Sequence, residues 1–337
     1  MFKIILMLAL WLPSVFYQKP EIKTFHINGY AQGTTYQIAY YASQPLVAKE
    51  EVDILLKKLD HSLSIYVPHS LINQFNNSSR GVLMDPYLHE VVLKSIEIYK
   101  KTDGNFDFTV YPLVQAWGFG TSKINQLPDA ATIQKCLKCV GSDKILIKQD
   151  SLIKTDPCVK IDVNGIAQGY SVDVVAKYLD RKQIKTYLVE IGGELVVKGV
   201  KPTGEPMQIG IESPSDSPFD SQSFQRIVQL KAGAITTSGN YRKYISSGTQ
   251  KYAHLIDPKT GYPLQNQMIS ATVIANDAIT ADGYDNALMA LDVVSALKLV
   301  KAHPSMEAYL IYKKADGSIA DTASVGFYKL LLPKDGN

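Results

Sequence analysis

Apolar and polar residues alternate along the chain with two different periods, which indicate where helices and strands form. Apolar residues at i, i+3, i+4 and i+7 indicate an amphipathic helix, and alternation at every second residue indicates a half-buried strand. The helical period predicts helices over residues 50–63, 88–101, 129–139, 166–179, 278–291 and 293–302. The shorter period predicts strands over residues 25–41, 160–163, 185–200, 206–214, 226–239, 251–258, 269–275 and 308–314.

Two shorter features complete this outline. Residues 144–147 and 152–154 predict a hairpin, and residues 64–78 predict a turn region. Helices and strands are mixed without the regular βαβ alternation of a doubly wound sheet, so the predicted class is α+β, with antiparallel sheets and packed helices. No internal repeat, low-complexity run or linker divides the sequence, and we expect residues 20–337 to form a single domain.

The first 19 residues have a composition of their own. Lys3 precedes an apolar run over residues 4–16, which is the arrangement of a secretory signal peptide. The run is shorter than the roughly 20 apolar residues of a membrane-spanning helix. We expect residues 1–19 to be a signal peptide or N-terminal anchor, and the protein to be exported to the periplasm, tethered to the inner membrane where the segment is retained.

Composition and charge narrow the class of partner. The chain of 337 residues is 46% hydrophobic and 20% charged, which is typical of a globular protein with a sizeable core. Its net charge is +3, and no block of Lys and Arg interleaved with aromatic residues occurs. Nucleic acid is therefore not an expected partner.

The chain contains three cysteines, Cys136, Cys139 and Cys158. The spacing of the first two matches a redox pair, and an exported protein could hold them as a disulfide. They lack the surroundings of a thioredoxin-like site and the further ligands of a metal site, which favours a structural or incidental pair. We expect Cys158 to be a small buried residue.

Two stretches combine turns and carboxylates in patterns that suit phosphate or metal binding. In KIDVNGIAQGYSVD, residues 160–173, a strand leads through Asn164-Gly165 into a helix, whose first N–H groups could bind an anion. The alternative is a tight connection that serves packing alone. In ITADGYDNALMAL, residues 279–291, Asp282 and Asn286 share a helix face with Asp285 beside them, and they could hold Mg²⁺ or form a solvated face.

Two further stretches carry hydroxyls and a histidine. AITTSGNYRKY, residues 234–244, offers Ser238 and Gly239, and HLIDPKTGYPL, residues 254–264, offers His254 and Thr260. These groups suit ribose or phosphate, although a polar turn explains the second stretch equally well. No G-x-S-x-G motif occurs, so a serine hydrolase is not supported.

The order of these stretches resembles the ApbE family, the FAD:protein FMN transferases. The resemblance extends from residue 29 to residue 291 and rests on GTTYQIAYY, LSIYVPHSLINQFN, DGNFDFTVYPLVQAWGFG, KIDVNGIAQGYSVD, YLVEIGGELVVKG, AITTSGNYRKY, HLIDPKTGYPL and ADGYDNALMAL. Each stretch alone is ambiguous, but their combination is specific. The resemblance implies an ApbE-like, T-fold-like mixed architecture.

The resemblance also implies a Mg²⁺-dependent enzyme with FAD as its substrate. Such an enzyme splits the FAD pyrophosphate, attaches FMN through a phosphoester to a threonine of an acceptor flavoprotein and releases AMP. Expected acceptors carry a threonine-containing motif, as do flavin-carrying subunits of membrane redox complexes. Phosphoryl transfer depends on positioning and charge neutralisation rather than on a protein nucleophile, which accounts for the oxygen-rich motifs. The sequence leaves open whether the protein forms a homodimer.

The family's site residues map onto this sequence by position. The implied metal ligands are the carbonyl of Gly165, Asp282 and Asn286, where the family usually has threonine at the last position. His254 and Asp282 are the candidates for the base that activates the threonine, and Gln168 stands where the family commonly has lysine. The implied FAD contacts are Gln32, Gly33, Thr34, Tyr66, Ser70, Trp117, Gly118, Phe119, Gly120, Asp162, Ala167, Gln168, Gly192, Gly193, Ser238, Gly239, His254 and Thr260.

Two other activities fit the same motifs. Water could replace the threonine, which would make the protein a FAD pyrophosphatase that yields FMN and AMP. Alternatively, Gln168 and Asn286 could have removed the chemistry and left a non-catalytic FAD-binding protein.

Overall fold

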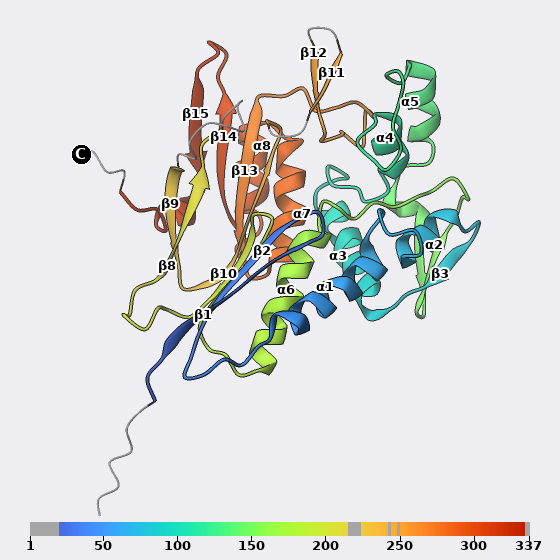
Figure 1. Cartoon of the computed structure of the whole chain (residues 1–337). Helices are drawn as coiled ribbons and strands as arrows, with labels where there is room; N and C mark the ends of the chain where they lie inside the picture. The colour runs from blue at the N-terminus through green and yellow to red at the C-terminus, as the bar shows by residue number, and fades with distance from the viewer. Residues whose placement is uncertain (1–19, 215–223, 242–243, 248–249, 334–337) are drawn as a thin grey trace, which may run out of the picture.

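The computed structural model describes residues 20–214, 224–241, 244–247 and 250–333 (Figure 1). Its central sheet has eight strands: β1 (Lys23–Ala31), β2 (Thr34–Ala42), β6 (Tyr187–Ile191), β7 (Glu194–Lys198), β10 (Ala232–Gly239), β13 (Met268–Ala275), β14 (Glu307–Lys313) and β15 (Ile319–Ala323). They lie in the order β1-β2-β6-β7-β10-β13-β14-β15, and every neighbouring pair is antiparallel. The predicted α+β class with antiparallel sheets is confirmed. The expected signal or anchor, residues 1–19, lies outside the described residues.

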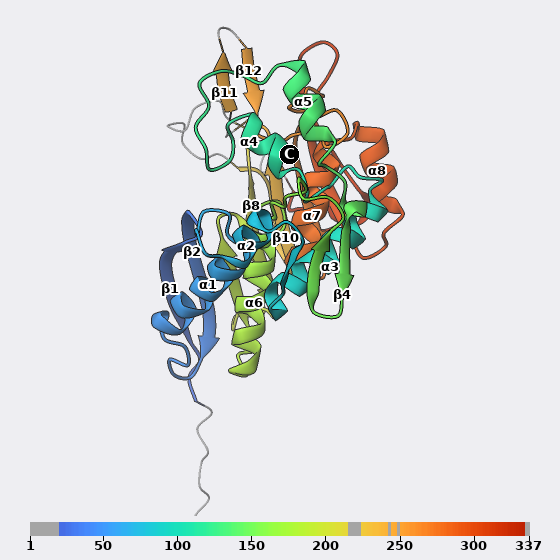
Figure 2. The same ribbon diagram turned by 90° about the vertical axis from the view of Figure 1, so that its right-hand side faces the viewer.

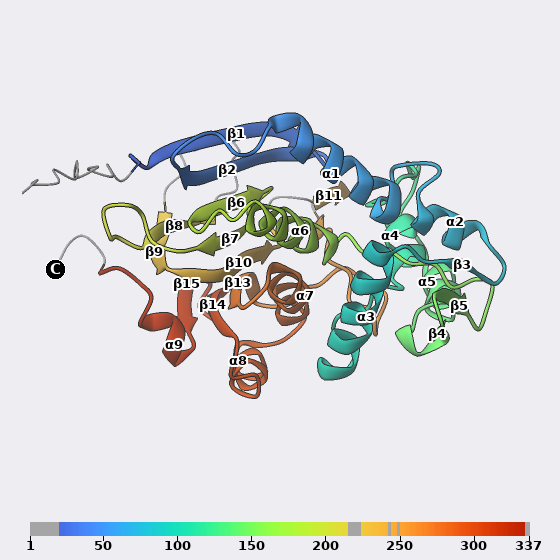
Figure 3. The same ribbon diagram turned by 90° about the horizontal axis from the view of Figure 1, so that it is seen from below.

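Helices cover one face of this sheet and a small sheet covers part of the other (Figure 3). The covering helices are α1 (Lys49–Leu63), α6 (Ala167–Arg181) and α7 (Ala278–Met289). The small sheet consists of β8 (Met207–Glu212) and β9 (Phe224–Leu230). Because both faces of the central strands are covered, β13 is buried along nearly its whole length.

The remaining elements flank these layers. The helices among them are α2 (Leu71–Asn77), α3 (Pro86–Lys101), α4 (Tyr111–Ala116), α5 (Ala130–Leu137), α8 (Val293–Lys301) and α9 (Val325–Tyr328). The strands are β3 (Gly81–Leu83), β4 (Ile145–Lys148) and β5 (Ser151–Lys154), which form one sheet, and the hairpin of β11 (Tyr244–Ser247) and β12 (Gln250–Ala253). This hairpin stands beside α4 and α5 (Figures 1 and 2). Within the described ranges, no helix is both long and apolar enough to cross a membrane.

Two apolar layers lie against the central sheet. The larger lies between the central sheet and the helices and includes Ile38, Leu56 and Val175, all fully or almost fully buried. The smaller lies between the central sheet and the β8–β9 pair and includes Ile209 and Val228. Each fully buried aliphatic side chain contributes about 1.5–3 kcal/mol relative to an exposed one, so these layers fix the strand ends that surround the site.

Helices α6 and α7 pack closely and hold each other's first turns. The Asp173 carboxylate in α6 accepts hydrogen bonds from the backbone N–H groups of Ala278 (2.8 Å) and Ile279 (2.9 Å) at the start of α7. In return, Asp282 in α7 accepts from the N–H of Gly169 in α6 at 2.8 Å. A Cβ at Gly169 would lie 2.3 Å from the carbonyl oxygen of Ala278, so this approach requires glycine.

The prediction of a strand over residues 160–163 is wrong. The backbone of this segment forms hydrogen bonds with a side chain and with a loop, and not with a neighbouring strand. The N–H of Ile161 donates to Oδ1 of Asn76 at 2.7 Å, and Nδ2 of Asn76 donates back to the Ile161 carbonyl at 2.9 Å. The N–H of Asp162 donates to the carbonyl of Phe108 at 2.8 Å. Ile161 and Val163 alternate with polar residues in the sequence, which mimics a strand, although Asp162 between them is buried as well.

The predicted turn region over residues 64–78 is also wrong in part, since it contains α2 (Leu71–Asn77). The hydroxyl of Ser70 accepts from the N–H of Asn73 at 3.2 Å and caps this helix. Two of its positions, Ile72 and Phe75, are fully buried. A helix of only seven residues presents too few apolar positions for the period to be recognised.

The cysteine prediction is corrected by the structure. The disulfide joins Cys139 to Cys158, with their Cα atoms 5.4 Å apart, and Cys136 is a free thiol. Cys158 is half-buried and bonded rather than a small buried residue. The Sγ of Cys136 lies 3.6 Å from the carbonyl oxygen of Pro112. The pairing depends on a tertiary approach that spacing along the chain does not encode.

Candidate functional site

A cavity of about 1280 Å³ opens where two hairpin turns of the central sheet meet α6 and α7. The turns are β1–β2, with Gln32 and Gly33, and β6–β7, with Gly192 and Gly193. The β8 strand and residues 105–108 line other parts of its wall. Sites for drug-sized ligands usually measure about 300–1,000 Å³, so this cavity has room for a larger ligand of dinucleotide size.

Most of the residues that the sequence nominated lie in the wall of this one cavity. They come from strands, helices and loops that are far apart along the chain. They are Gln32, Gly33, Tyr66, Phe119, Asp162, Gly165, Ala167, Gln168, Gly192, Gly193, Ser238, Gly239, His254, Asp282 and Asn286.

Six nominated residues do not line the cavity: Thr34, Ser70, Trp117, Gly118, Gly120 and Thr260. Trp117 is only 3% exposed, and its Nε1 donates to the carbonyl of Gly261 at 2.8 Å. Thr260 donates from its hydroxyl to Oδ2 of Asp257 at 3.0 Å. These contacts give both residues a part in holding the loops near the cavity.

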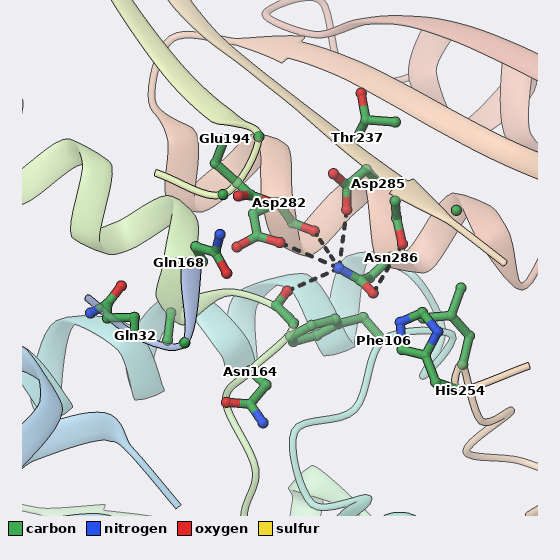
Figure 4. Close-up of a pocket in the computed structure, with 18 of the residues that line it drawn as sticks. Gln32, Phe106, Asn164, Gln168, Glu194, Thr237, His254, Asp282, Asp285 and Asn286 are labelled. Atoms are coloured by element: carbon green, nitrogen blue, oxygen red, sulfur yellow. Dashed lines mark hydrogen bonds between the residues drawn. The ribbon is translucent and has the colours of Figure 1, made fainter. Parts of the chain in front are cut away.

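Oxygen atoms from two segments converge on the side chain of Asn286 (Figure 4). Its Nδ2 lies 3.0 Å from the carbonyl oxygen of Asp282, 3.3 Å from Oδ1 of Asp282 and 3.0 Å from Oδ1 of Asp285. It also lies 3.2 Å from the carbonyl oxygen of Gly165, in the turn before α6. The sequence placed Asp282, Asp285 and Asn286 on one helix and implied Gly165 as a further ligand, and the structure brings the Gly165 carbonyl to this helix.

Burial makes this wall of the cavity unfavourable for uncompensated negative charge. Burial, with a smaller contribution from the nearby Asp173 carboxylate, raises the pKa of Asp282 to about 7. The pKa values of Asp285 and Glu194 also lie well above their usual range, chiefly because of burial and then because of repulsion from Asp282. Burial raises the pKa of Asp162 to about 6. A cation or protons must therefore neutralise these groups.

The residues present fit a hard divalent cation. In the described part of the chain, no group of three or more His, Cys, Asp or Glu side chains is arranged to hold a metal ion. The predicted ligands are instead one carboxylate, one side-chain amide and one backbone carbonyl, all oxygen donors of the kind that Mg²⁺ prefers. Four oxygens that already surround one polar atom support this assignment.

The chain matches known proteins over most of its length. The sequence profile of the ApbE family matches residues 32–310. The chain belongs to the ApbE family. This result confirms the resemblance found in the sequence motifs.

Relatives of this ApbE protein carry a functional name. A Vibrio cholerae protein named FAD:protein FMN transferase is 35% identical over 308 residues, which cover 89% of this chain and 90% of that protein. An Escherichia coli K12 protein of the same name is 30% identical, and the match covers 89% of each chain.

Solved structures agree with the fold. The flavin transferase ApbE from Vibrio cholerae superposes with a TM-score of 0.82 at 34% identity, covering 92% of this chain and 100% of that one. The apo form of the Pseudomonas stutzeri flavinyl transferase ApbE gives a TM-score of 0.81 at 33% identity, covering 92% and 97%.

Gln168 and Asn286, at which the motif resemblance implied other residues, both line the cavity. Nε2 of Gln168 donates to the carbonyl of Ile191 at 2.8 Å and so ties the start of α6 to the β6–β7 turn. A Cβ at Gly192, where φ is +63°, would lie 1.8 Å from this Nε2. The absence of a Cβ at Gly192 therefore leaves the space that the side-chain amide of Gln168 occupies.

Several residues of the cavity wall were missed in the sequence. Glu194 is the most informative, because its Oε2 is buried without a hydrogen-bond partner among the described residues. Its place directly after the Gly192-Gly193 turn was a usable signal, since a residue that starts a strand after such a turn lies at a sheet end. Phe106 and Asn164 also lie in the wall (Figure 4), and no period distinguishes them from ordinary loop residues.

His254 lies in the cavity wall with its ring against Phe119, at a centroid distance of 6.4 Å. In Figure 4 it stands on the side of Asn286 away from Asp282. The two candidate bases therefore approach the cavity from different sides.

Proposed function

We propose that this chain is a Mg²⁺-dependent FAD:protein FMN transferase, which moves FMN from FAD to a threonine hydroxyl of an acceptor flavoprotein and releases AMP. The observation that carries the proposal is the meeting of Gly165, Asp282 and Asn286 in the wall of a cavity large enough for FAD. The names of the Vibrio cholerae and Escherichia coli relatives, 35% and 30% identical to this chain, support it.

The start of α6 offers a place for the phosphates of FAD. Ala167 and Gln168, in its first turn, line the cavity. The N-terminus of a helix carries a partial positive charge of about half a unit, which favours phosphate oxygens. The N–H of Gly169 is already engaged by Oδ2 of Asp282, which holds this carboxylate in place and leaves Oδ1 toward the cavity.

Gly165, Asp282 and Asn286 would hold the cation beside these phosphates. Mg²⁺ bound there would neutralise charge on the pyrophosphate and on the transferred phosphoryl group. Because Asp282 is only 4% exposed, its charge would act in a poorly solvated environment, where such interactions are strong.

The transfer exchanges a phosphoanhydride bond of FAD for a phosphoester bond to threonine. The threonine oxygen forms a bond to the phosphorus of the FMN half, and the bond from that phosphorus to the bridging oxygen breaks, so that AMP departs with the electron pair. His254 is our candidate to accept the hydroxyl proton, since an imidazole is the common base near neutral pH. In Figure 4 it lies on the side of Asn286 away from Asp282.

We also propose that the protein acts after export, in the periplasm. The positively charged start and short apolar run of residues 1–19 support this location. An acceptor in the same compartment, such as a flavin-carrying subunit of a membrane redox complex, would then be within reach.

Incubation with FAD, Mg²⁺ and an acceptor domain tests the proposal. Covalent flavin on the acceptor supports transfer, whereas FMN and AMP without a modified acceptor support hydrolysis. Stable bound FAD without products supports a binding protein. Asp282→Ala should abolish the covalent product, and Asp316→Ala, at an exposed position between β14 and β15, serves as the matched control.

A further inference from the structure

The four oxygens around Asn286 outnumber what its amide group can bind. A side-chain –NH₂ carries two hydrogens, yet four oxygens lie between 3.0 and 3.3 Å from Nδ2. Two of these oxygens belong to carboxylates, of Asp282 and Asp285, that are 4% and 1% exposed. At most two can receive a direct hydrogen bond, so their convergence exceeds the needs of the amide.

The opposite end of the same amide has a partner that accepts either orientation. Oδ1 of Asn286 lies 3.4 Å from the hydroxyl oxygen of Ser238. A serine hydroxyl can donate or accept. If the amide turned over, Nδ2 would donate to Ser238 and this contact would persist.

The turned-over amide would face the four oxygens with a fifth, Oδ1. Oδ1 would then stand where Nδ2 stands now, among oxygens 3.0–3.3 Å away, and such a cluster is repulsive unless a positive charge lies within it. A hard divalent cation takes such all-oxygen sets, including side-chain amide oxygens. The two orientations of the amide therefore correspond to two conditions of the site, without a cation and with one.

We propose that Asn286 is a two-position ligand. Its amide nitrogen holds the oxygens of Gly165, Asp282 and Asp285 together when no cation is bound, and its amide oxygen ligates the cation after the amide turns over. This inference rests on the proposed function only in taking a divalent cation to bind at Gly165 and Asp282. Asn286 thus stabilises the folded protein when no cation is bound. When a cation binds, the side-chain amide of Asn286 rotates.

Two substitutions of similar size separate these roles. Asn286→Asp keeps the oxygen ligand but removes both N–H donors and adds a third buried carboxylate. Its melting temperature in EDTA at pH 8 should be lower than that of the wild type, and its affinity for Mg²⁺ should be at least about tenfold higher, since ligand charge tunes cation affinity. Asn286→Leu removes donor and ligand alike, so its melting temperature should fall in EDTA and should not respond to Mg²⁺.

Thermal melting of the three proteins in EDTA and across a Mg²⁺ titration, with and without FAD, measures these effects apart from catalysis. The side-chain ¹⁵N resonance of Asn286, assigned by its loss in Asn286→Asp, should shift as Mg²⁺ saturates the wild type. The inference is overturned if Asn286→Asp and the wild type have the same melting temperature in EDTA. It is also overturned if the resonance stays fixed in the presence of Mg²⁺, whether or not Mg²⁺ raises the melting temperature.

The same experiments separate this inference from the proposed function. A moving Asn286 resonance in a protein that transfers no FMN would support the inference and contradict the transferase. Mg²⁺-dependent transfer with an unmoved resonance and an unaffected Asn286→Asp variant would support the transferase and contradict the inference.

Discussion

Asp173 in α6 and Asp282 in α7 hold each other's helices in place. Asp173 binds two N–H groups at the start of α7, and Asp282 binds the N–H of Gly169 in the first turn of α6. This exchange sets the two helices side by side and presents Oδ1 of Asp282 to Asn286 at 3.3 Å. The structural core and the candidate metal site therefore share one carboxylate.

The close approach of α6 and α7 should not tolerate a side chain at Gly169. A Cβ there would lie 2.3 Å from the carbonyl oxygen of Ala278 and 2.7 Å from Cβ of Asp282. We expect Gly169→Ala to lower the free energy of unfolding by about 1–3 kcal/mol, the usual effect of overpacking. Urea unfolding measures this change.

Gly283→Ala, in the middle of α7, is the matched control for that substitution. Both replacements gain the same helix propensity, about 1 kcal/mol, but a Cβ at Gly283 first meets the end of the flexible Ile98 side chain. Equal stabilities of the two variants would contradict the proposed helix contact.

The buried carboxylate of Asp173 should make stability depend on pH. Burial raises its pKa to about 7 in the folded protein, from an ordinary value of 3.8. The unfolded chain ionises first, so the contribution of Asp173 to stability is fully present below pH 3.8 and is lost as pH rises through 7. For this group we expect a loss of roughly 2–4 kcal/mol, since one pKa unit corresponds to about 1.4 kcal/mol.

Asp173→Asn isolates this effect. The variant should be less stable at pH 5, by about 1–3 kcal/mol, because one N–H of Ala278 or Ile279 loses its acceptor. Its stability should then fall less than that of the wild type between pH 5 and pH 8. The free energy of unfolding is measured by urea unfolding in EDTA between pH 5 and pH 8. If it changes with pH by the same amount in the wild type and in Asp173→Asn, the raised pKa assigned to Asp173 is wrong.

The Cys139–Cys158 disulfide should stabilise the segment that leads to the site. It closes a loop with a sequence separation of 19 residues, and a loop of this size is worth about 3 kcal/mol in the chain-entropy description. We expect Cys158→Ser and treatment with a reductant to lower the melting temperature by similar amounts, without an additive effect. Cys136→Ser should leave it unchanged, and a larger effect of Cys136→Ser would mean that the pairing is wrong.

The hydrophobic pattern of the sequence predicted the elements that are long and regularly periodic. The helix expected over 278–291 is α7 (Ala278–Met289), and the strand expected over 269–275 is β13 (Met268–Ala275). The predictions fail where an element is too short for its hydrophobic period to be recognised, or where a residue distant in the sequence determines the local structure. Asn76 replaces a strand as the partner of Ile161, and a distant approach selects Cys158 over Cys136.

The candidate site shows the same limit. Asp282 and Asn286 could be predicted together, because four residues separate them on one helix. The order of the motifs supplied Gly165, but its distance from Asn286 depends on the packing of the turn before α6 against α7. Glu194 was missed because its place after the Gly192-Gly193 turn indicates a sheet end, but only the fold shows that this sheet end lies in the cavity wall.

Gln168 provides a test of the electrostatics of the phosphate site. It lines the cavity, and its amide is seated against Ile191. Gln168→Lys would place a cation beside the buried Glu194 and near bound phosphates, so we expect FAD to bind about tenfold more tightly, as a charged hydrogen bond is worth roughly 1.5–3 kcal/mol. The affinity gain should shrink at high salt.

Gln168→Met, of similar length and without charge, is the control for this substitution. It should bind FAD no more tightly than the wild type, as measured by calorimetry. A similar gain in affinity for both variants would assign the effect to packing and would remove the electrostatic role of this position.

The most direct measurement combines the intact mass of the acceptor with the AMP released in the same reaction. A threonine-containing acceptor domain is incubated with FAD, Mg²⁺ and either the wild-type protein, Asp282→Ala or Asp316→Ala. The proposed transferase predicts an acceptor that gains the mass of one FMN phosphoester and an equal amount of AMP, with both lost in Asp282→Ala and retained in Asp316→Ala. AMP with an unmodified acceptor, or a modified acceptor from Asp282→Ala, would contradict it.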